Sequence, residues 1–113
     1  MSHRTSIHIA FIAALMFAET SPAVGAEPAQ MDAAHQSYHL GQYQRSLALY
    51  ELLAAQGHAE AAERAGYMLM MGPIAYGAQV PRDVTRATEL LEQAAMAGSQ
   101  HAFFLLEMAG QAD

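Results

Sequence analysis

The chain contains no cysteine and no lysine among its 113 residues. Without cysteine there is no disulfide framework, no thiol nucleophile and no zinc site with sulfur ligands. Without lysine, a Schiff-base mechanism has no side-chain amine to use. Basic residues are scarce altogether, since 5 of them stand against 11 acidic residues and the net charge is −6. Nucleic acid and anionic lipid surfaces repel such a chain, so we exclude both as partners.

A signal peptide for export is predicted over residues 1–26. Arg4 makes the start basic, residues 7–17 form an apolar run, and residues 24–26 read as a small-x-small cleavage site. Spanning a bilayer takes about 20 apolar residues, and this run is much shorter. We therefore expect cleavage near Ala26, no stable membrane insertion afterwards, and a periplasmic or secreted protein. The alternative is a segment that is retained as an anchor.

Cleavage leaves a flexible lead-in, residues 27–30, and one domain, residues 31–113. Hydrophobic residues recur in this domain with a helical period, and no strand-like alternation or Asn-Gly or Asp-Gly hairpin turn is present. The segment from Gly72 to Arg82, with two prolines and two glycines, is predicted to be a non-helical connection. We predict an all-α fold, with helices over residues 31–40, 43–56, 58–71, 83–97 and 99–109.

The domain repeats itself with an offset of 41 residues. Residues 46–61 align with residues 87–102, so that Gly57 corresponds to Gly98. Each copy reads as a helix that ends at a glycine and is followed at once by the start of the next helix, for which Ser99 is a suitable N-cap. Helices joined this tightly must fold back on one another, which indicates stacked helix pairs.

Three segments resemble the Sel-one-like repeat, an α/α relative of the tetratricopeptide repeat: AGYMLMMG (65–72), VPRDVTRA (80–87) and AAMAG (94–98). Residues 33–57 resemble a preceding tetratricopeptide-type unit, and the connection over residues 73–79 is longer than in the family pattern. The resemblance implies a short α/α solenoid of about two and a half helix-pair repeats after the cleaved signal peptide. The positions that carry the repeat pattern, with Asp83 also an expected N-cap, are Gly41, Gly57, Gly66, Gly72, Asp83, Ala87, Ala94, Ala95 and Gly98.

The resemblance also implies a function, namely a non-enzymatic adaptor or scaffold that binds another polypeptide and needs no cofactor. Helical solenoids form a concave face that receives an extended or helical segment. Aromatic residues, methionine and arginine are enriched where proteins bind one another. On this basis the candidate partner-binding residues are Tyr43, Arg45, Tyr67, Met68, Met71, Tyr76 and Arg82.

The last predicted helix carries the apolar segment AFFLLEM, residues 102–108. We expect Phe103 and Phe104 to contribute buried area, as Leu53 and Leu91 do. Because this helix is only the first half of a repeat, part of its apolar side is expected to be uncovered. Three alternatives follow: a homodimer through this helix, a partner protein, or the N-terminal helix folded over it.

A second functional hypothesis is a small periplasmic protein that binds copper or zinc. His35 and His39 have the i, i+4 spacing that lets two imidazoles share an ion, but protein zinc sites usually use three or four ligands. Met68 and Met71 could offer thioethers to copper(I). Methionines at helical spacing are also typical of a hydrophobic core, which is the interpretation we favour.

A third hypothesis is a hydrolase that uses Ser99 and His101, with Asp83 or Glu107 as the carboxylate. The sequence contains no nucleophile elbow and no Ser-x-x-Lys motif. Because Ser99 is already placed to cap a helix, we expect no catalytic residue.

Overall fold

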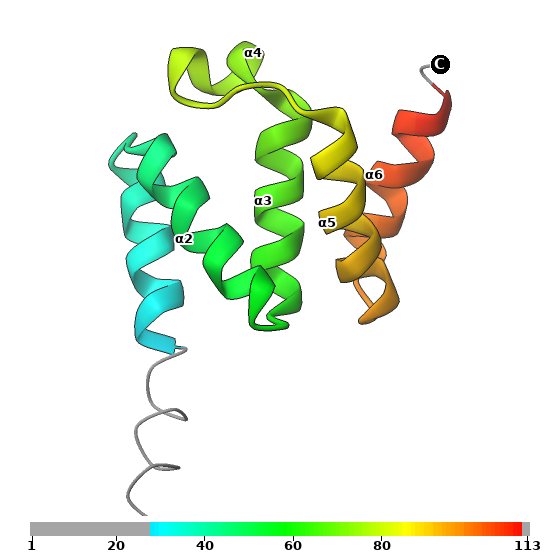
Figure 1. The fold of residues 1–113 in the computed structure, drawn as a ribbon, viewed down its shortest axis with the longest axis horizontal. Coiled ribbons are helices and arrows are strands. Elements are labelled where there is room, and N and C mark those ends of the chain that lie inside the picture. The colour runs from blue at the N-terminus through cyan, green and yellow to red at the C-terminus, as the bar shows by residue number, and fades with distance from the viewer. Residues whose placement is uncertain (1–27, 112–113) are drawn as a thin grey trace, which may run out of the picture.

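The computed structural model describes residues 28–111, and every regular element within them is helical. After an N-terminal helix over residues 28–39, the chain forms α2 (Tyr43–Ala55), α3 (Ala59–Met71), the short α4 (Pro73–Tyr76), the 3₁₀ turn η1 (Gly77–Gln79), α5 (Val84–Met96) and α6 (Gln100–Gln111) (Figure 1). The predicted all-α class is confirmed for this part of the chain. The predicted signal peptide lies outside the described residues. Of the helices between residues 28 and 111, none combines the length and the apolar character that a membrane crossing requires.

The observed helices follow the predicted ones closely, with two differences. Residues 28–30, which were expected in the lead-in, already belong to the N-terminal helix. The expectation of a wholly non-helical connection after α3 is wrong, because Pro73 begins α4, where its fixed φ suits the first helical position. Gly72, with a φ of 57°, separates α3 from α4, and Gly77, with a φ of 66°, ends α4 after this single turn.

Three helices end in the same way, at Gly41, Gly57 and Gly98, all of which have a positive φ. Each of these glycines donates its N–H to the carbonyl three residues earlier, and the next residue donates its N–H to the carbonyl five residues before itself. These are Schellman motifs, in which the left-handed conformation makes glycine the preferred residue. The motifs after α2 and α5 recur at the predicted offset and turn the chain directly into the next helix.

Side chains cap two of the helices where the sequence predicts them. The Oδ1 atom of Asp83 accepts a hydrogen bond from the backbone N–H of Arg86 at 3.0 Å, and the Oγ atom of Ser99 accepts one from the N–H of Ala102 at 3.0 Å. α3 begins after His58 without a side-chain cap, and the Nδ1 atom of this histidine is buried with no hydrogen-bond partner among the described residues.

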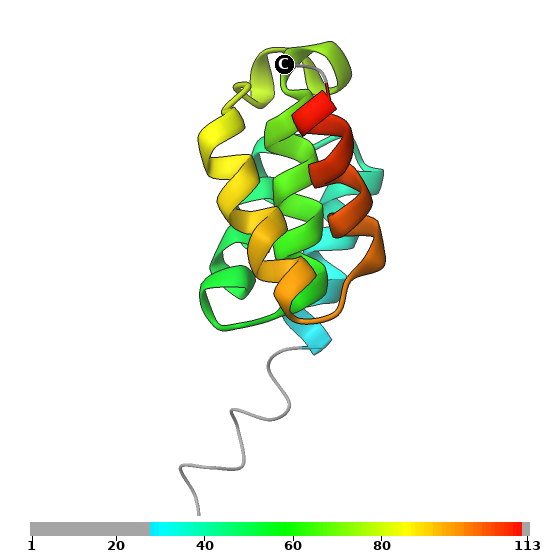
Figure 2. The same ribbon diagram turned by 90° about the vertical axis from the view of Figure 1, so that its right-hand side faces the viewer.

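α3 is the central helix of the fold. It packs most extensively on α5, and it also packs on α2 and α6 (Figures 1 and 2). Small residues allow α3 and α5 to approach closely, because Gly66 lies directly against Leu91 and Ala87 is fully buried. On the side away from α6, Gln93 of α5 donates its side-chain N–H to the carbonyl of Ala54 at the end of α2, at 2.7 Å.

The core differs from the predicted one at α6. Phe103 and Phe104, expected to be buried, are 57% and 56% exposed. The reason is the rotation of α6 about its own axis, which turns Ala102 and Leu105 toward the core and the two residues between them away from it. Met108 is 52% exposed as well, so α6 does present an apolar surface. The largest side chains that are fully buried are Tyr50, Leu53, Met68, Leu90, Leu91 and Val80.

Candidate functional site

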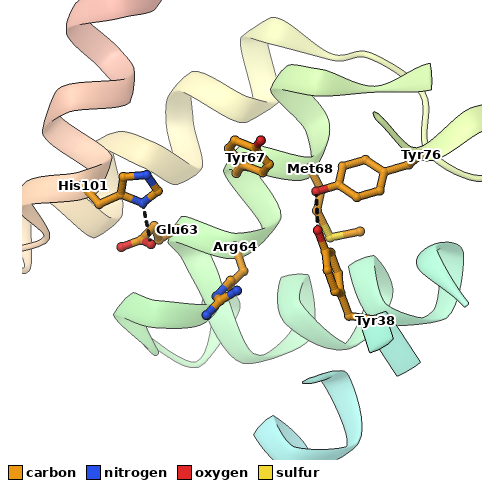
Figure 3. A pocket seen from close by; sticks show the side chains of 7 residues that line it. All are labelled: Tyr38, Glu63, Arg64, Tyr67, Met68, Tyr76 and His101. Atoms are coloured by element: carbon orange, nitrogen blue, oxygen red, sulfur yellow. Dashed lines mark hydrogen bonds and ion pairs between the residues drawn. The ribbon is translucent and has the colours of Figure 1, made fainter. Parts of the chain in front are cut away.

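Two adjoining hollows lie on the face of the molecule that the N-terminal helix, α3 and α6 share. Tyr38 and Arg64 line both of them, so we describe the two together as the groove. The tyrosine hollow, of about 260 Å³, is lined by Tyr38, Glu63, Arg64, Tyr67, Met68, Tyr76 and His101 (Figure 3). The histidine hollow, of about 220 Å³, is lined by His35, Tyr38, His39, Tyr50 and Arg64.

One wall of the tyrosine hollow is a pair of tyrosines from distant parts of the chain. The hydroxyl oxygens of Tyr38 and Tyr76 are 2.9 Å apart and share a hydrogen bond (Figure 3). Tyr43 packs edge-on against Tyr76 with 4.8 Å between the ring centroids. Burial, together with the hydrogen bond shared with Tyr38, raises the pKa of Tyr76 well above its ordinary value, so this hydroxyl stays neutral. The wall is therefore aromatic, uncharged and held in place by tertiary contacts.

The opposite wall is centred on the carboxylate of Glu63 in α3. It accepts a hydrogen bond from the hydroxyl of Ser99 at 2.6 Å and lies 2.9 Å from Nδ1 of His101 (Figure 3). Partial burial alone would raise the pKa of Glu63. The hydrogen bonds from Ser99 and His101, with the positive charges of His101 and Arg64, outweigh that effect and hold the pKa below its ordinary value of 4.5. A charged carboxylate thus connects α3 to the start of α6.

Arg64 projects from α3 (Figure 3) and lines both hollows. Its side chain is 48% exposed, and its ion pair with Glu60, one turn earlier, is long at 3.7 Å. Glu60 also lies 3.7 Å from Nε2 of His35, and Nδ1 of that histidine is hydrogen-bonded to the buried hydroxyl of Tyr50. The histidine hollow therefore presents one accessible guanidinium and two imidazoles, with Glu60 as the neighbouring carboxylate.

Gln79 holds the connection after α3 against the start of α2. Its side-chain carbonyl accepts hydrogen bonds from the backbone N–H groups of Tyr43 and Gln44, at 2.8 and 3.3 Å, and its amide donates to the carbonyl of Gly41 at 2.9 Å. The longer connection over residues 73–79 thereby brings Tyr76 into the groove wall. This role of Gln79 was missed because its partners lie more than 30 residues away in the sequence.

The groove contains three of the candidate partner-binding residues: Tyr67, Met68 and Tyr76. Met68 is 1% exposed and Tyr76 is 6% exposed, so they form the lining of the hollow, whereas the prediction treated them as projecting contacts. Tyr67 is half-buried on the same helix as Arg64. Tyr43 supports the aromatic wall from behind, through its contact with Tyr76.

The remaining three candidates lie elsewhere. Arg45 lines a separate open hollow beside the start of α2. Met71 is half-buried at the end of α3, and Arg82 donates its Nε–H to the carbonyl of Met70 at 3.2 Å, next to the end of that helix. The seven candidates thus do not form one site. Conversely, Arg64 and Glu63 were not singled out, since their importance depends on which helices face α3.

His35 and His39 both line the histidine hollow. Among residues 28–111, no group of three histidine, aspartate or glutamate side chains is arranged to hold a metal ion. His35 is instead engaged by Tyr50 and Glu60. Met68, from the methionine cluster, is packed in the core, in line with the interpretation favoured above.

Ser99 and His101 are both bound to the same carboxylate, that of Glu63. A nucleophile set requires the histidine to contact the serine hydroxyl and take its proton. Here the carboxylate stands between the two, and Ser99 caps α6 at the same time. Asp83, one of the two carboxylates considered for this set, caps α5 instead. The arrangement acts as a structural link between α3 and α6.

No family model matches this chain, no curated protein is significantly similar to it in sequence, and no solved structure is significantly similar to it in fold. The resemblance to Sel-one-like repeats therefore stays a prediction.

Proposed function

We propose that this chain is a non-enzymatic interaction module, exported to the periplasm, that binds a polypeptide segment in the groove. The observation that carries the proposal is the groove itself, in which accessible polar groups and aromatic rings from three separate helices converge on one face. Concave sites with an apolar lining and a few placed polar groups are the usual form of a binding site. Tyrosine and arginine, both present here, are the residue types enriched among binding hot spots.

The order of the helices supports a solenoid-like interpretation. The N-terminal helix and α2 form one candidate pair, α3 and α5 a second, and α6 the first half of a third. The groove is then lined by the first helix of each pair, with Tyr76 added from the longer connection. The recurrence of the same helix ending after α2 and α5 supports the repeat offset. Arrays of this kind bind extended or helical segments on the face that their first helices share.

Export is part of the proposal and rests on residues 1–26. The mass of the protein recovered from a periplasmic fraction tests it, since cleavage near Ala26 predicts a mature chain that begins near Glu27. Recovery of the uncleaved chain from membranes would favour the retained anchor instead.

The binding function can be tested with a random peptide library displayed on phage and selected on the immobilised protein. Synthetic copies of enriched peptides are then titrated into ¹⁵N-labelled protein. We expect amide shifts that concentrate at Arg64, Tyr67 and His101. Shifts confined to the opposite side, around Leu52 of α2 and Glu92 of α5, or the absence of any enriched peptide, would reject the groove as the binding site.

A further inference from the structure

We propose that the histidine hollow is a subsite for an acidic side chain, an aspartate or glutamate of the bound segment. This inference rests on the proposed function and deepens it by naming the chemistry of the partner. It assigns a role to the histidine pair, which among residues 28–111 belongs to no group of three side chains that could hold a metal ion.

The lining of the histidine hollow is suited to an anion. The groups that can donate a hydrogen bond to a ligand here are the guanidinium of Arg64 and the imidazoles of His35 and His39. The hydroxyls of Tyr38 and Tyr50 also line the hollow but are already hydrogen-bonded to Tyr76 and His35. None of these lining residues is a carboxylate. The planar guanidinium can bind a carboxylate through two parallel hydrogen bonds, which is the strongest and most directional ion pair available to a protein side chain.

Arg64 is available for such a ligand. Its side chain is 48% exposed, and its observed partner is Glu60 at 3.7 Å, which is too long for a good hydrogen bond. An exposed ion pair of this kind contributes little, so exchanging Glu60 for a better-placed carboxylate costs little.

Glu60 occupies the edge of the hollow as a resident carboxylate. It lies 3.7 Å from both His35 and Arg64, so a negative charge already stands beside these two groups. An incoming carboxylate competes with Glu60 for the same donors and is repelled by it. Removing the charge of Glu60 should therefore strengthen binding, whereas removing the charge of Arg64 should weaken it. The negative charge of the rest of the chain acts weakly here, because the Debye length is about 8 Å at physiological ionic strength.

The tyrosine hollow continues from the same two residues, Tyr38 and Arg64, and offers a different lining. Met68 and the rings of Tyr67 and Tyr76 give it an aromatic and apolar wall, opposite the carboxylate of Glu63. When a bound segment places a carboxylate beside Arg64, a neighbouring apolar residue of that segment can therefore enter the tyrosine hollow. The expected partner sequence has an acidic residue close to a leucine, methionine or aromatic residue.

The test uses peptides enriched from the phage library and copies in which each aspartate or glutamate is replaced by its amide. Affinities are measured by fluorescence anisotropy with the wild-type protein and four variants. Arg64→Gln is compared with Arg86→Gln, because the Arg86 side chain is 43% exposed, ion-paired and located on α5 away from the groove. Glu60→Gln is compared with Glu89→Gln, since Glu89 is also exposed and paired with an arginine.

We expect the acidic peptides to lose about tenfold in affinity with Arg64→Gln, as for a lost charge-assisted hydrogen bond. Glu60→Gln should tighten the same peptides about two- to fivefold. The affinity of the amide-substituted peptides should be the same for Arg64→Gln, Glu60→Gln and the wild type. The two control variants should bind the acidic peptides as the wild type does. Equal losses with Arg64→Gln and Arg86→Gln, weaker binding with Glu60→Gln, or enriched peptides without acidic residues would overturn the subsite and leave the binding function standing. A library that yields no peptide at all rejects both.

Discussion

Gly66 of α3 and Leu91 of α5 lie so close together that a Cβ atom at position 66 would come within 2.8 Å of the Cγ atom of Leu91. The same atom would lie 3.2 Å from the carbonyl oxygen of Ala87. Leu91 is fully buried and has little freedom to move away. α3 and α5, the two most extensively packed helices, can therefore lie this close together because position 66 carries no side chain.

Replacing Gly66 with alanine should destabilise the fold. Overpacking a core costs about 1–3 kcal/mol, whereas alanine gains about 1 kcal/mol over glycine in a helix, so we expect a net loss of about 1 kcal/mol. Chemical denaturation measures this loss. Gly110→Ala on α6 is the matched control, since a Cβ there meets nothing within 4 Å. That variant should be neutral or slightly more stable, and equal effects of the two changes would contradict the packing argument.

Gln79 should act as an N-cap for α2 supplied from outside the helix. Gln79→Ala removes the acceptor for the N–H groups of Tyr43 and Gln44, and losing such a cap costs about 0.5–2 kcal/mol. Hydrogen exchange at these two amides should accelerate. As a control, Gln42→Ala alters the residue in the N-cap position of α2, which makes no side-chain cap hydrogen bond, and should change exchange little. Unchanged exchange in Gln79→Ala would show that the contact contributes nothing to the start of α2.

Features that depend on neighbouring residues in the chain could be predicted from the sequence. The helix endings at Gly57 and Gly98 and the caps at Asp83 and Ser99 are confirmed, because each is specified within about one turn of helix. An uncovered apolar side of the last helix was expected, but Phe103 and Phe104 were also counted among the buried residues. The sequence does not show which apolar residues of a helix face the core until its orientation in the fold is known.

The groove could be predicted only in part, because it joins residues far apart in the sequence. Tyr38 and Tyr76 are separated by 38 positions and meet only through the turn formed by α4. The i, i+4 spacing indicates that His35 and His39 lie on one side of their helix, and both line the histidine hollow. Their neighbours Tyr50 and Arg64 come from other helices, and these neighbours decide what the imidazoles can bind.

The hydrogen bond between Tyr38 and Tyr76 should contribute to stability as a coupled pair. A double-mutant cycle with Tyr38→Phe and Tyr76→Phe tests this, with unfolding free energies from denaturant titration. A hydrogen bond of this kind contributes about 0.5–1.5 kcal/mol net, so we expect a coupling energy in that range. Strictly additive single effects would mean that the two hydroxyls do not depend on each other.

The Glu63 carboxylate should make stability depend on pH. Since its pKa is lowered in the folded state, its contribution is present in full above its ordinary pKa of 4.5 and is lost as the pH falls below that value. Glu63→Gln should therefore be less stable than the wild type near neutral pH, and the difference should shrink in acid. Glu92→Gln, at an exposed position on α5, is the control and should follow the wild-type curve. A constant gap between wild type and Glu63→Gln at all pH values would contradict the assignment.

The exposed apolar surface of α6 predicts self-association at high protein concentration. Phe103, Phe104 and Met108 are each more than half exposed, and burying aromatic rings is among the larger sources of interface energy. Sedimentation velocity over a range of concentrations should show a dimer that the double variant Phe103→Ser, Phe104→Ser abolishes. Leu52→Ser on α2, where the leucine is 50% exposed, removes a comparable surface residue and should leave the dimer intact. A wild-type protein that stays monomeric throughout would leave this face to a partner protein, because the N-terminal helix lies beside α2 at the other end of the molecule and does not cover α6 (Figure 1). Loss of the dimer in both variants would point to non-specific association.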